Sequence, residues 1–324
     1  MSQLHHPPVI DLSPLLNEAP NREEVIQAID QACREWGFFI VTGHGVDPAL
    51  VDTLLQLCSK FFALPEEEKA RIAMPLSGSA WRGWFPLGGE LTSGVADHKE
   101  GIYFGTECSP EQAHGRPMHG PNMFPEVPEL LGATVRRYLE ELTSLGHLLI
   151  CALDDALGVN GQLRHLTEDP LILFRAFIYP PHRDGWGVGE HTDYGLLTLL
   201  ATDGHPGLQV RVGEQWISVD PVPNSFVCNL GDMLERATGG RYRSTPHRVR
   251  NLANTSRISL PFFFDPGWES RVMPLDHPAE AATSSAHQTL PSRWDGADPL
   301  LFEGTYGEYV WSKVGKVFPR IHHA

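Results

Sequence analysis

The chain has 324 residues, of which 41% are hydrophobic and 20% are charged. A chain of this length can bury a sizeable core, and its composition is that of an ordinary globular protein, which excludes a disordered or fibrous one. Lysine and arginine number 25 against 40 aspartate and glutamate residues, which gives a formal net charge of -15. A field of this sign repels phosphate backbones, so we expect no nucleic-acid partner.

Cysteine usage and the N-terminal sequence predict a protein of the cytoplasm. The five cysteines lie far apart and form no C-x-x-C pair, which fits neither a disulfide framework nor a zinc ribbon. The start of the chain lacks a basic segment followed by an apolar one, and no later stretch has the apolar length of a membrane span. We therefore expect a soluble protein without membrane association, and we infer no obligate protein partner.

Residues 1–165 are predicted to form a mainly helical N-terminal region. Asn21 and Glu24 have the spacing of a capping box, and Gly158 is a typical helix end. Periodicity and turn residues predict the following segments: a short strand at 8–11, a helix at about 22–36, a buried strand at 38–41, a helix from Pro48, loops with short strands at 71–125, and a long amphipathic helix at 128–157.

From Leu171 onward the sequence predicts a β-rich core. Short apolar or alternating runs, separated by Gly, Pro, Asn and Asp, extend to Phe264 and include one at 242–250. Strands this closely spaced predict a barrel or a double-sheet jelly roll wrapped by the earlier helices, so the fold class is α+β. We treat 1–324 as a single domain, with the jelly-roll core at 166–270 and a C-terminal extension with a helix at 271–324.

Two histidines and an aspartate form the first candidate site. The segment from Glu190 to Tyr194 is expected to begin a strand, whose alternation would point His191 and Asp193 to the same face. His247, in a later strand-like segment, is the candidate third ligand. Two imidazoles and one carboxylate on one octahedral face leave three open positions, which suits non-haem Fe(II) and O2 chemistry.

Other interpretations of these three residues stay open at this point. The chain has 16 histidines, so an H-x-D pair can arise by chance as an ordinary surface or core feature. Two histidines and a carboxylate also bind catalytic Zn2+, although the familiar zinc pattern, H-E-x-x-H on a helix, is missing from this sequence.

Arg257 and Ser259 start the apolar run that ends at Phe264. Alternation places the guanidinium and the hydroxyl on one face of the predicted strand. An arginine that faces an apolar interior is costly unless an anion pairs with it. That anion could be a protein carboxylate. Beside a metal triad, a forked donor and a hydroxyl also suit the distal carboxylate of a bound diacid.

Short motifs follow one another in a fixed order along nearly the whole chain. In the N-terminal half they are Trp36-Gly-Phe-Phe-Ile-Val, His44-Gly45-Val46, Phe61-Phe62-Ala-Leu-Pro with Lys69, and Lys99-Glu100-Gly101-Ile-Tyr-Phe-Gly. Further on they are His191-Thr-Asp193-Tyr-Gly, Asn229-Leu-Gly231-Asp232, His247-Arg248-Val249 and Arg257-Ile-Ser259-Leu-Pro-Phe-Phe. In this order they resemble the isopenicillin N synthase-like branch of the 2-oxoglutarate/Fe(II) oxygenases, which includes plant flavonoid and gibberellin oxidases.

The resemblance implies a distorted double-stranded β-helix with iron at one mouth. Fe(II), 2-oxoglutarate and O2 are the implied cofactor and cosubstrates, and Arg257 and Ser259 are implied to bind the distal carboxylate of 2-oxoglutarate. Tyr179 matches a tyrosine that often assists. Many plant members have asparagine two residues earlier, where this chain has Phe177. The implied activity is hydroxylation, desaturation or ring closure of a small organic substrate, with release of succinate and CO2.

Two other functions fit the same motifs. The chain could use O2 without 2-oxoglutarate, as isopenicillin N synthase does, or it could be a catalytically silent metal-binding or sensor protein. In that synthase a glutamine of the C-terminal tail occupies an iron position, whereas the final glutamine here is Gln288. The closing segment 306–319 predicts an amphipathic helix and contains no glutamine. His322 and His323 are less favoured candidates for a tail ligand.

Six residues of the loop-rich segment 71–125 are candidates for the wall of an aromatic substrate pocket. Ordinary core packing is the alternative interpretation. The six are Trp81, Arg82, Trp84, Phe85, Tyr103 and Phe104.

Overall fold

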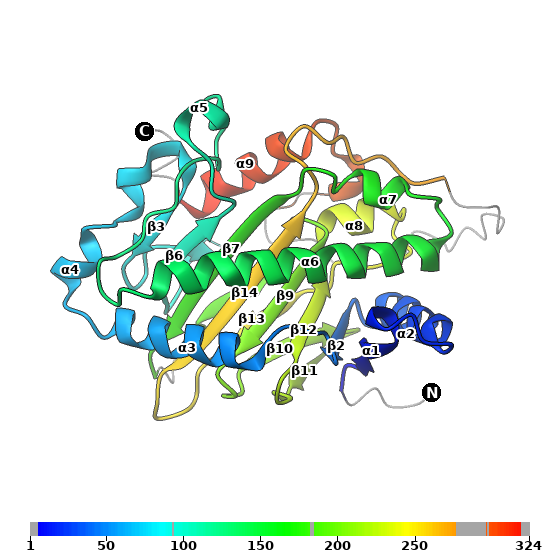
Figure 1. Cartoon of the computed structure of the whole chain (residues 1–324), viewed down its shortest axis with the longest axis horizontal. Helices are drawn as coiled ribbons and strands as arrows, with labels where there is room; N and C mark the ends of the chain where they lie inside the picture. The colour runs from blue at the N-terminus through cyan, green and yellow to red at the C-terminus, as the bar shows by residue number, and fades with distance from the viewer. Residues whose placement is uncertain (1–5, 93, 182–184, 277–295, 297, 319–324) are drawn as a thin grey trace.

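The computed structural model describes residues 6–92, 94–181, 185–276, 296 and 298–318. Its largest element is an eight-stranded sheet (Figure 1). In spatial order the strands are β1 (Val9–Asp11), β2 (Phe38–Thr42), β12 (Phe226–Leu230), β9 (Leu197–Thr202), β14 (Arg257–Asp265), β7 (Leu171–Tyr179), β6 (Glu100–Gly105) and β3 (Gly83–Phe85).

A second sheet has four strands, and a hairpin forms a third, two-stranded sheet. The four strands, in spatial order, are β11 (Gln215–Val219), β10 (Leu208–Val212), β13 (His247–Val249) and β8 (Val188–His191). The hairpin consists of β4 (Leu91–Thr92) and β5 (Val95–Ala96). Side chains from both larger sheets line a common cavity, so the cavity lies between them.

Helices cover the face of the large sheet that points away from this cavity. The longest, α6 (Leu131–Leu157), crosses the front of the sheet beside α3 (Pro48–Phe62) in Figure 1. Elsewhere in the fold, not all on this face, are α1 (Ser13–Leu16), α2 (Arg22–Glu35), α4 (Glu66–Ala70), α5 (Pro110–Ala113), α7 (Gln162–His165), α8 (Asp232–Ala237) and α9 (Tyr306–Val317), with short 3-10 helices at Met74–Ala80 and Pro299–Leu301.

The contact between α6 and β14 is close because Gly146 carries no side chain. A Cβ atom at this position would lie 2.4 Å from a ring carbon of Phe264, which is fully buried. Phe264 points toward the helix, so its neighbours Phe263 and Asp265 point to the opposite face, where both line the cavity. Packing on one face of the sheet therefore fixes which side chains reach the cavity on the other.

The helices and strands confirm the expected α+β arrangement and most of the expected elements. Region 1–165 contributes four strands to the large sheet, in the segments where strands were predicted at 8–11, at 38–41 and within 71–125. Asn21 stands at the start of α2, but its side chain makes no capping hydrogen bond, so the predicted capping box is wrong. The division of the chain into one domain with three regions stays a prediction.

Two further differences lie in the β-rich region. The strand predicted over 242–250 is reduced to β13, since Pro246 has no N–H group with which to continue the ladder. The short helix α8 had no counterpart in the sequence analysis. Among the described residues, no helix is both long enough and apolar enough to cross a membrane.

Asp154 holds the end of α6 and the turn that follows it. Its carboxylate accepts hydrogen bonds from the backbone N–H groups of Gly161 at 2.7 Å and Leu163 at 2.9 Å, and the residue is 1% exposed. We expect Asp154→Ala to lower the free energy of unfolding by roughly 1–3 kcal/mol, because it leaves buried donors without a partner.

The matched control is Asp155→Ala, one residue along. Asp155 forms its ion pairs with Arg22 and Arg164 at the surface, and such pairs are worth roughly 0–1 kcal/mol. Urea unfolding followed by circular dichroism measures both variants. Equal loss of stability in the two would contradict the role given to Asp154.

Candidate functional site

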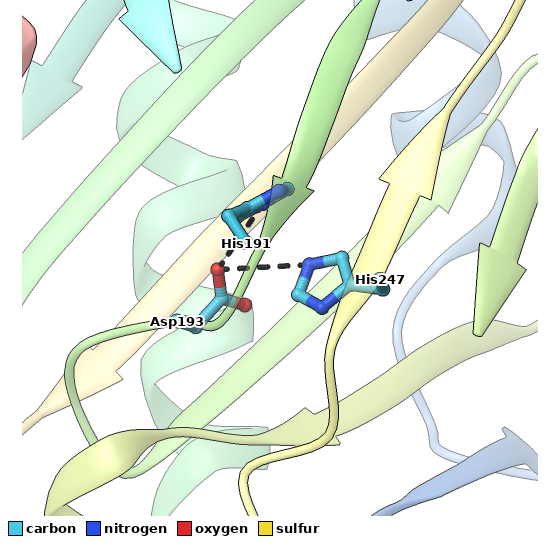
Figure 2. Close-up of side chains that lie close together, drawn as sticks. All are labelled: His191, Asp193 and His247. Carbon is cyan, nitrogen blue, oxygen red and sulfur yellow. Dashed lines mark ion pairs between the residues drawn. The ribbon is translucent and has the colours of Figure 1, made fainter. Parts of the chain in front are cut away.

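His191, Asp193 and His247 lie together at one end of the four-stranded sheet (Figure 2). His191 is the last residue of β8, Asp193 follows two residues later, and His247 is the first residue of β13. The Nε2 atoms of both histidines lie 3.8 Å from Oδ1 of Asp193. In the described part of the chain this is the group of three His, Cys, Asp or Glu residues that could hold a metal ion.

Backbone carbonyls orient both imidazoles. Nδ1 of His191 lies 2.8 Å from the carbonyl oxygen of Gly189, and Nδ1 of His247 lies 3.1 Å from that of Thr245. A carbonyl can only accept, so each Nδ1 must carry the hydrogen and each Nε2 keeps a lone pair. The two lone-pair atoms therefore face the carboxylate, as metal ligation requires.

Asp193 is held through one oxygen, which leaves the other available. Oδ2 accepts hydrogen bonds from the hydroxyl of Thr198 and, at 2.6 Å, from the side-chain amide of Asn229. Oδ1 is the atom that faces the histidines. Because Thr198 and Asn229 come from β9 and β12 of the large sheet, the position of the carboxylate depends on both sheets.

The charges of the triad suit a metal ion. Burial, followed by the proximity of His247, lowers the pKa of His191 to about 3. Burial works against ionisation of Asp193, but the two histidines and the hydrogen bonds from Asn229 and Thr198 bring its pKa below the ordinary value. A neutral imidazole and an ionised carboxylate are the states in which these side chains bind metals.

The route by which His191 and Asp193 meet differs from the prediction. They were expected to share a face of one strand, but β8 ends at His191 and Asp193 lies beyond it. The backbone instead turns, and the N–H of Asp232 donates to the carbonyl of Asp193 at 2.8 Å. The prediction that the side chains converge is confirmed, while the alternation invoked for it is wrong.

Arg257 is buried in the same cavity with unused hydrogen-bonding capacity. Its Nε donates to the carbonyl of His205 at 3.1 Å, whereas its Nη1 is buried without a hydrogen-bond partner. Among the described residues, no carboxylate forms an ion pair with it. The alternative that Arg257 pairs with a protein carboxylate is thus not supported. An anion from solution could accept a hydrogen bond from its Nη1.

Ser259 and Tyr179 lie beside Arg257. The Ser259 hydroxyl donates to the Tyr179 hydroxyl at 3.2 Å, and the guanidinium carbon of Arg257 is 5.3 Å from the Tyr179 ring centre. Arg257 and Tyr179 are directly opposed in the pairing of β14 with β7. These three side chains therefore form one polar end of the cavity, as the sequence analysis expected.

The remaining cavity wall combines apolar side chains with a second group of charges. Strands of both sheets and helix α9 contribute to it. The apolar contributors include Leu173, Phe177, Val188, Leu200, Leu208, Val249, Val310 and Val317, and the charged ones include Glu90, Lys99, Arg175 and Asp265.

The six predicted pocket residues do not line this cavity. Trp81, Arg82, Trp84, Phe85, Tyr103 and Phe104 are each at most 4% exposed, and none belongs to the cavity wall. They belong to β3, β6 and the residues just before β3, next to β7 in the large sheet, where Tyr103 is paired with Arg175 across the strands. The prediction of an aromatic pocket wall is corrected accordingly, since these side chains form core that supports the wall.

Sequence reasoning missed five polar residues at the site. Asn229 and Lys99 stood inside recognised motifs, but no role was assigned to them. No sequence pattern pointed to Thr198 as a site residue. Arg175 had the same signal as Arg257, an arginine within an apolar strand. The fifth, Glu90, comes from an irregular segment whose path cannot be derived from periodicity.

The C-terminal segment closes one side of the cavity. The predicted amphipathic helix is present as α9, and its Tyr306, Val310 and Val317 line the cavity. None of these side chains is a carboxamide. His322 and His323, named as less favoured tail ligands, lie outside the described residues.

Two family models match the chain. The model described as "non-haem dioxygenase in morphine synthesis N-terminal" matches residues 7–127, and that of the "2OG-Fe(II) oxygenase superfamily" matches residues 167–266. The chain is 40% identical to a probable iron/ascorbate oxidoreductase of Dictyostelium discoideum, over 96% of this chain and 94% of the relative.

Two other relatives have named substrates. A 1-aminocyclopropane-1-carboxylate oxidase of Dictyostelium discoideum is 35% identical, over 96% of this chain and 95% of that one. A homoarginine-6-hydroxylase of Arabidopsis thaliana is also 35% identical, over 95% of this chain and 96% of that one.

The same fold occurs in a solved structure. A full-length Neurospora crassa protein, crystallised in complex with alpha-KG (2-oxoglutarate) and thymine, has a TM-score of 0.79 to this chain at 24% sequence identity. The similarity covers 97% of this chain and 98% of that one. The expected jelly-roll core is thereby confirmed.

Substitution of each triad residue tests whether these three side chains bind Fe(II). We expect His191→Ala, Asp193→Ala and His247→Ala each to lose stoichiometric Fe(II), because each removes one of three converging donors. Atomic absorption after anaerobic equilibration and desalting measures bound iron, and circular dichroism checks the fold. His165→Ala is the control, because His165 is exposed and pairs with Glu168 away from the triad. Wild-type Fe(II) affinity in His247→Ala would show that the third ligand is wrongly assigned.

Proposed function

Because the chain belongs to the 2-oxoglutarate/Fe(II)-dependent oxygenase family, we propose that it hydroxylates, desaturates or cyclises a small organic substrate and releases succinate and CO2. It is an oxidoreductase that uses Fe(II), 2-oxoglutarate and O2. One observation carries the proposal: the triad and the unpartnered Nη1 of Arg257 lie in the walls of a single cavity.

We assign the metal to the triad and the distal carboxylate of 2-oxoglutarate to the polar end of the cavity. His191, Asp193 and His247 offer two imidazole nitrogens and one carboxylate oxygen, a donor set suited to Fe(II) with open positions. Arg257 offers a forked cation, and Ser259 offers a hydroxyl, beside Tyr179.

The protein's own part in the reaction is to hold the metal, to orient the substrate and to exclude water. When bound, Fe(II) and 2-oxoglutarate supply the oxidising chemistry, in which O2 is reduced and the oxo acid is decarboxylated. Thr198 and Asn229 fix the carboxylate of Asp193, so that it cannot rotate away from the metal. The apolar side chains of both sheets keep water from the site and restrict how a substrate lies there.

Relatives support a small-molecule substrate. Two are named for their action on 1-aminocyclopropane-1-carboxylate and on homoarginine, and the structural neighbour binds thymine. We propose the cytoplasm as the compartment, because all five cysteines are free. We propose no nucleic-acid substrate, since the strongly negative chain repels phosphate backbones.

Helix α9 favours an enzyme that uses 2-oxoglutarate over one that uses O2 without it. Val310 and Val317 of α9 are apolar where they line the cavity, and Tyr306 donates its hydroxyl hydrogen to Asp265. Within the described portion of the tail no His, Cys, Asp or Glu residue joins the triad as a further ligand. The positions that the triad leaves open are thus available to a chelating oxo acid.

Arg257 is expected to be the main anchor of 2-oxoglutarate. A charge-assisted hydrogen bond contributes about 1.5–3 kcal/mol, so the loss of two in Arg257→Ala should weaken binding roughly 100-fold or more. Anaerobic titration of the Fe(II) protein, followed by the metal-to-cosubstrate charge-transfer band, measures this affinity. Arg136→Ala is the control, because Arg136 stacks on Phe124 outside the cavity. An unchanged affinity in Arg257→Ala would reject the anchor.

The proposed reaction requires 2-oxoglutarate in every turnover. Purified protein supplied with Fe(II), ascorbate and O2 should form succinate slowly without substrate and faster with one, and Asp193→Ala should form none. Succinate and O2 uptake are measured with and without 2-oxoglutarate across a panel of small substrates. Full-rate oxidation of any substrate without 2-oxoglutarate would overturn the proposed function.

A further inference from the structure

Arg175 is a second arginine in the cavity with unused donors. It projects from β7 on the same face as Phe177 and Tyr179, all of which line the cavity. In the described part of the chain it makes no hydrogen bond, and its Nε is buried without a partner. The nearest carboxylate oxygen, Oε1 of Glu90, is 3.7 Å from its Nη1, which is too long for a hydrogen bond.

Aromatic rings hold this guanidinium in place. Its central carbon lies 4.4 Å from the ring centre of Tyr103, 4.7 Å from that of Phe263 and 4.9 Å from that of Trp81. Ring faces attract the cation without engaging its N–H groups. Arg175 is therefore positioned in advance, with its directional donors left for another group.

Glu90 lies between Arg175 and a buried ion pair. Lys99 Nζ is 2.8 Å from Glu90 Oε2 and 2.7 Å from Asp97 Oδ2, and the side chains of all three are at most 4% exposed. Burial opposes ionisation of Glu90, but Lys99 and Arg175 hold its pKa below the ordinary value. Glu90 is thus an anion at neutral pH, and Lys99 has a second anionic partner in Asp97.

The formal charges of this group cancel. Lys99 and Arg175 are positive, and Glu90 and Asp97 are negative. A ligand that carried only a negative charge would leave a buried group with an uncompensated charge, which is costly. A ligand that carries a carboxylate and an ammonium side by side adds no net charge, so the group and its ligand together stay neutral.

Arg175 is separate from the site proposed for 2-oxoglutarate. It lies four positions before Tyr179 on β7, a distance of about 13 Å along a strand. Tyr179 is the residue opposed to Arg257. A diacid bound at Arg257 therefore leaves Arg175 open to a second ligand in the same cavity.

We propose that Arg175 and Glu90 form the substrate subsite, and that it takes the head group of an α-amino acid, with the carboxylate on Arg175 and the ammonium on Glu90. The inference rests on the proposed function, since it names the substrate class of the same cavity. Forked N–H donors match the two oxygens of a carboxylate, and the Glu90 carboxylate matches a protonated amine.

The test measures binding, with Fe(II) and 2-oxoglutarate present and O2 excluded. Isothermal calorimetry is run with a panel of L-α-amino acids together with 1-aminocyclopropane-1-carboxylate and L-homoarginine. For each compound that binds, its amide and its deaminated acid are measured as well. We expect at least one amino acid to bind, and its amide to bind about 100-fold more weakly, because the amide has no carboxylate for Arg175.

Two variants separate the two contacts. Arg175→Gln should lower the affinity for the amino acid about 100-fold and leave the affinity for 2-oxoglutarate unchanged. Glu90→Gln should remove the preference for the amino acid over its deaminated acid, while Lys99 keeps Asp97 as its partner. Arg136→Gln, which alters an aromatic-stacked arginine outside the cavity, should change neither affinity.

Each other outcome counts against the inference. It is wrong if no panel member binds, if amide and acid bind equally, or if Arg175→Gln binds as the wild type does. Should Arg175→Gln lose its cooperative thermal transition, Arg175→Lys, which keeps the charge without the fork, must still weaken amino-acid binding. Succinate formation by the wild type, measured in parallel, distinguishes failure of the proposed subsite from failure of the proposed function. If it occurs and Arg175 proves irrelevant, only the subsite fails; if it never occurs, the proposed function fails.

Discussion

Strands β7 and β14 run antiparallel beside each other, and their pairing determines what the cavity contains. Arg257 is opposed to Tyr179 and Ser259 to Phe177, so the inward residues of both strands meet as cross-strand neighbours. The outward residues pack against the helices, where Phe264 lies against Gly146. A shift of the pairing by one residue would turn Arg257 and Ser259 toward the helices. The apolar packing outside therefore secures the polar arrangement inside.

The sequence alone predicted much of this because its signals are local. Alternation in an apolar strand placed Arg257 and Ser259 correctly, and helix α6 and its end at Gly158 followed from periodicity and a glycine. The convergence of His191 with Asp193 was also correct, although a turn after β8 produces it. The motif implied the proximity, whereas the strand geometry assumed for it was wrong.

The parts that could not be predicted depend on long-range packing. Whether Tyr103 faces a cavity or the core is decided by the position of β6 at the outer side of β7, which no local pattern contains. The same holds for Thr198 and Asn229, which reach Asp193 from two strands of the other sheet. Arg175 is a different case, because it too is an arginine in an apolar strand, but it has no hydroxyl residue two positions later such as the Ser259 that accompanies Arg257.

The two arginines are held by different means, and the difference fits the different ligands that we propose for them. Arg257 gives one N–H to a backbone carbonyl, which fixes the direction of the remaining donors, as an anchor for an invariant cosubstrate requires. Arg175 is held by ring faces, which restrain the plane of the guanidinium but constrain its rotation within that plane less than a hydrogen bond does. Such a cation can align with carboxylates that enter at slightly different angles. The cavity thus combines a more rigid arginine, at the site proposed for 2-oxoglutarate, with a more adaptable one at the site proposed for the substrate. In this arrangement the family's chemistry can be retained while the substrate changes.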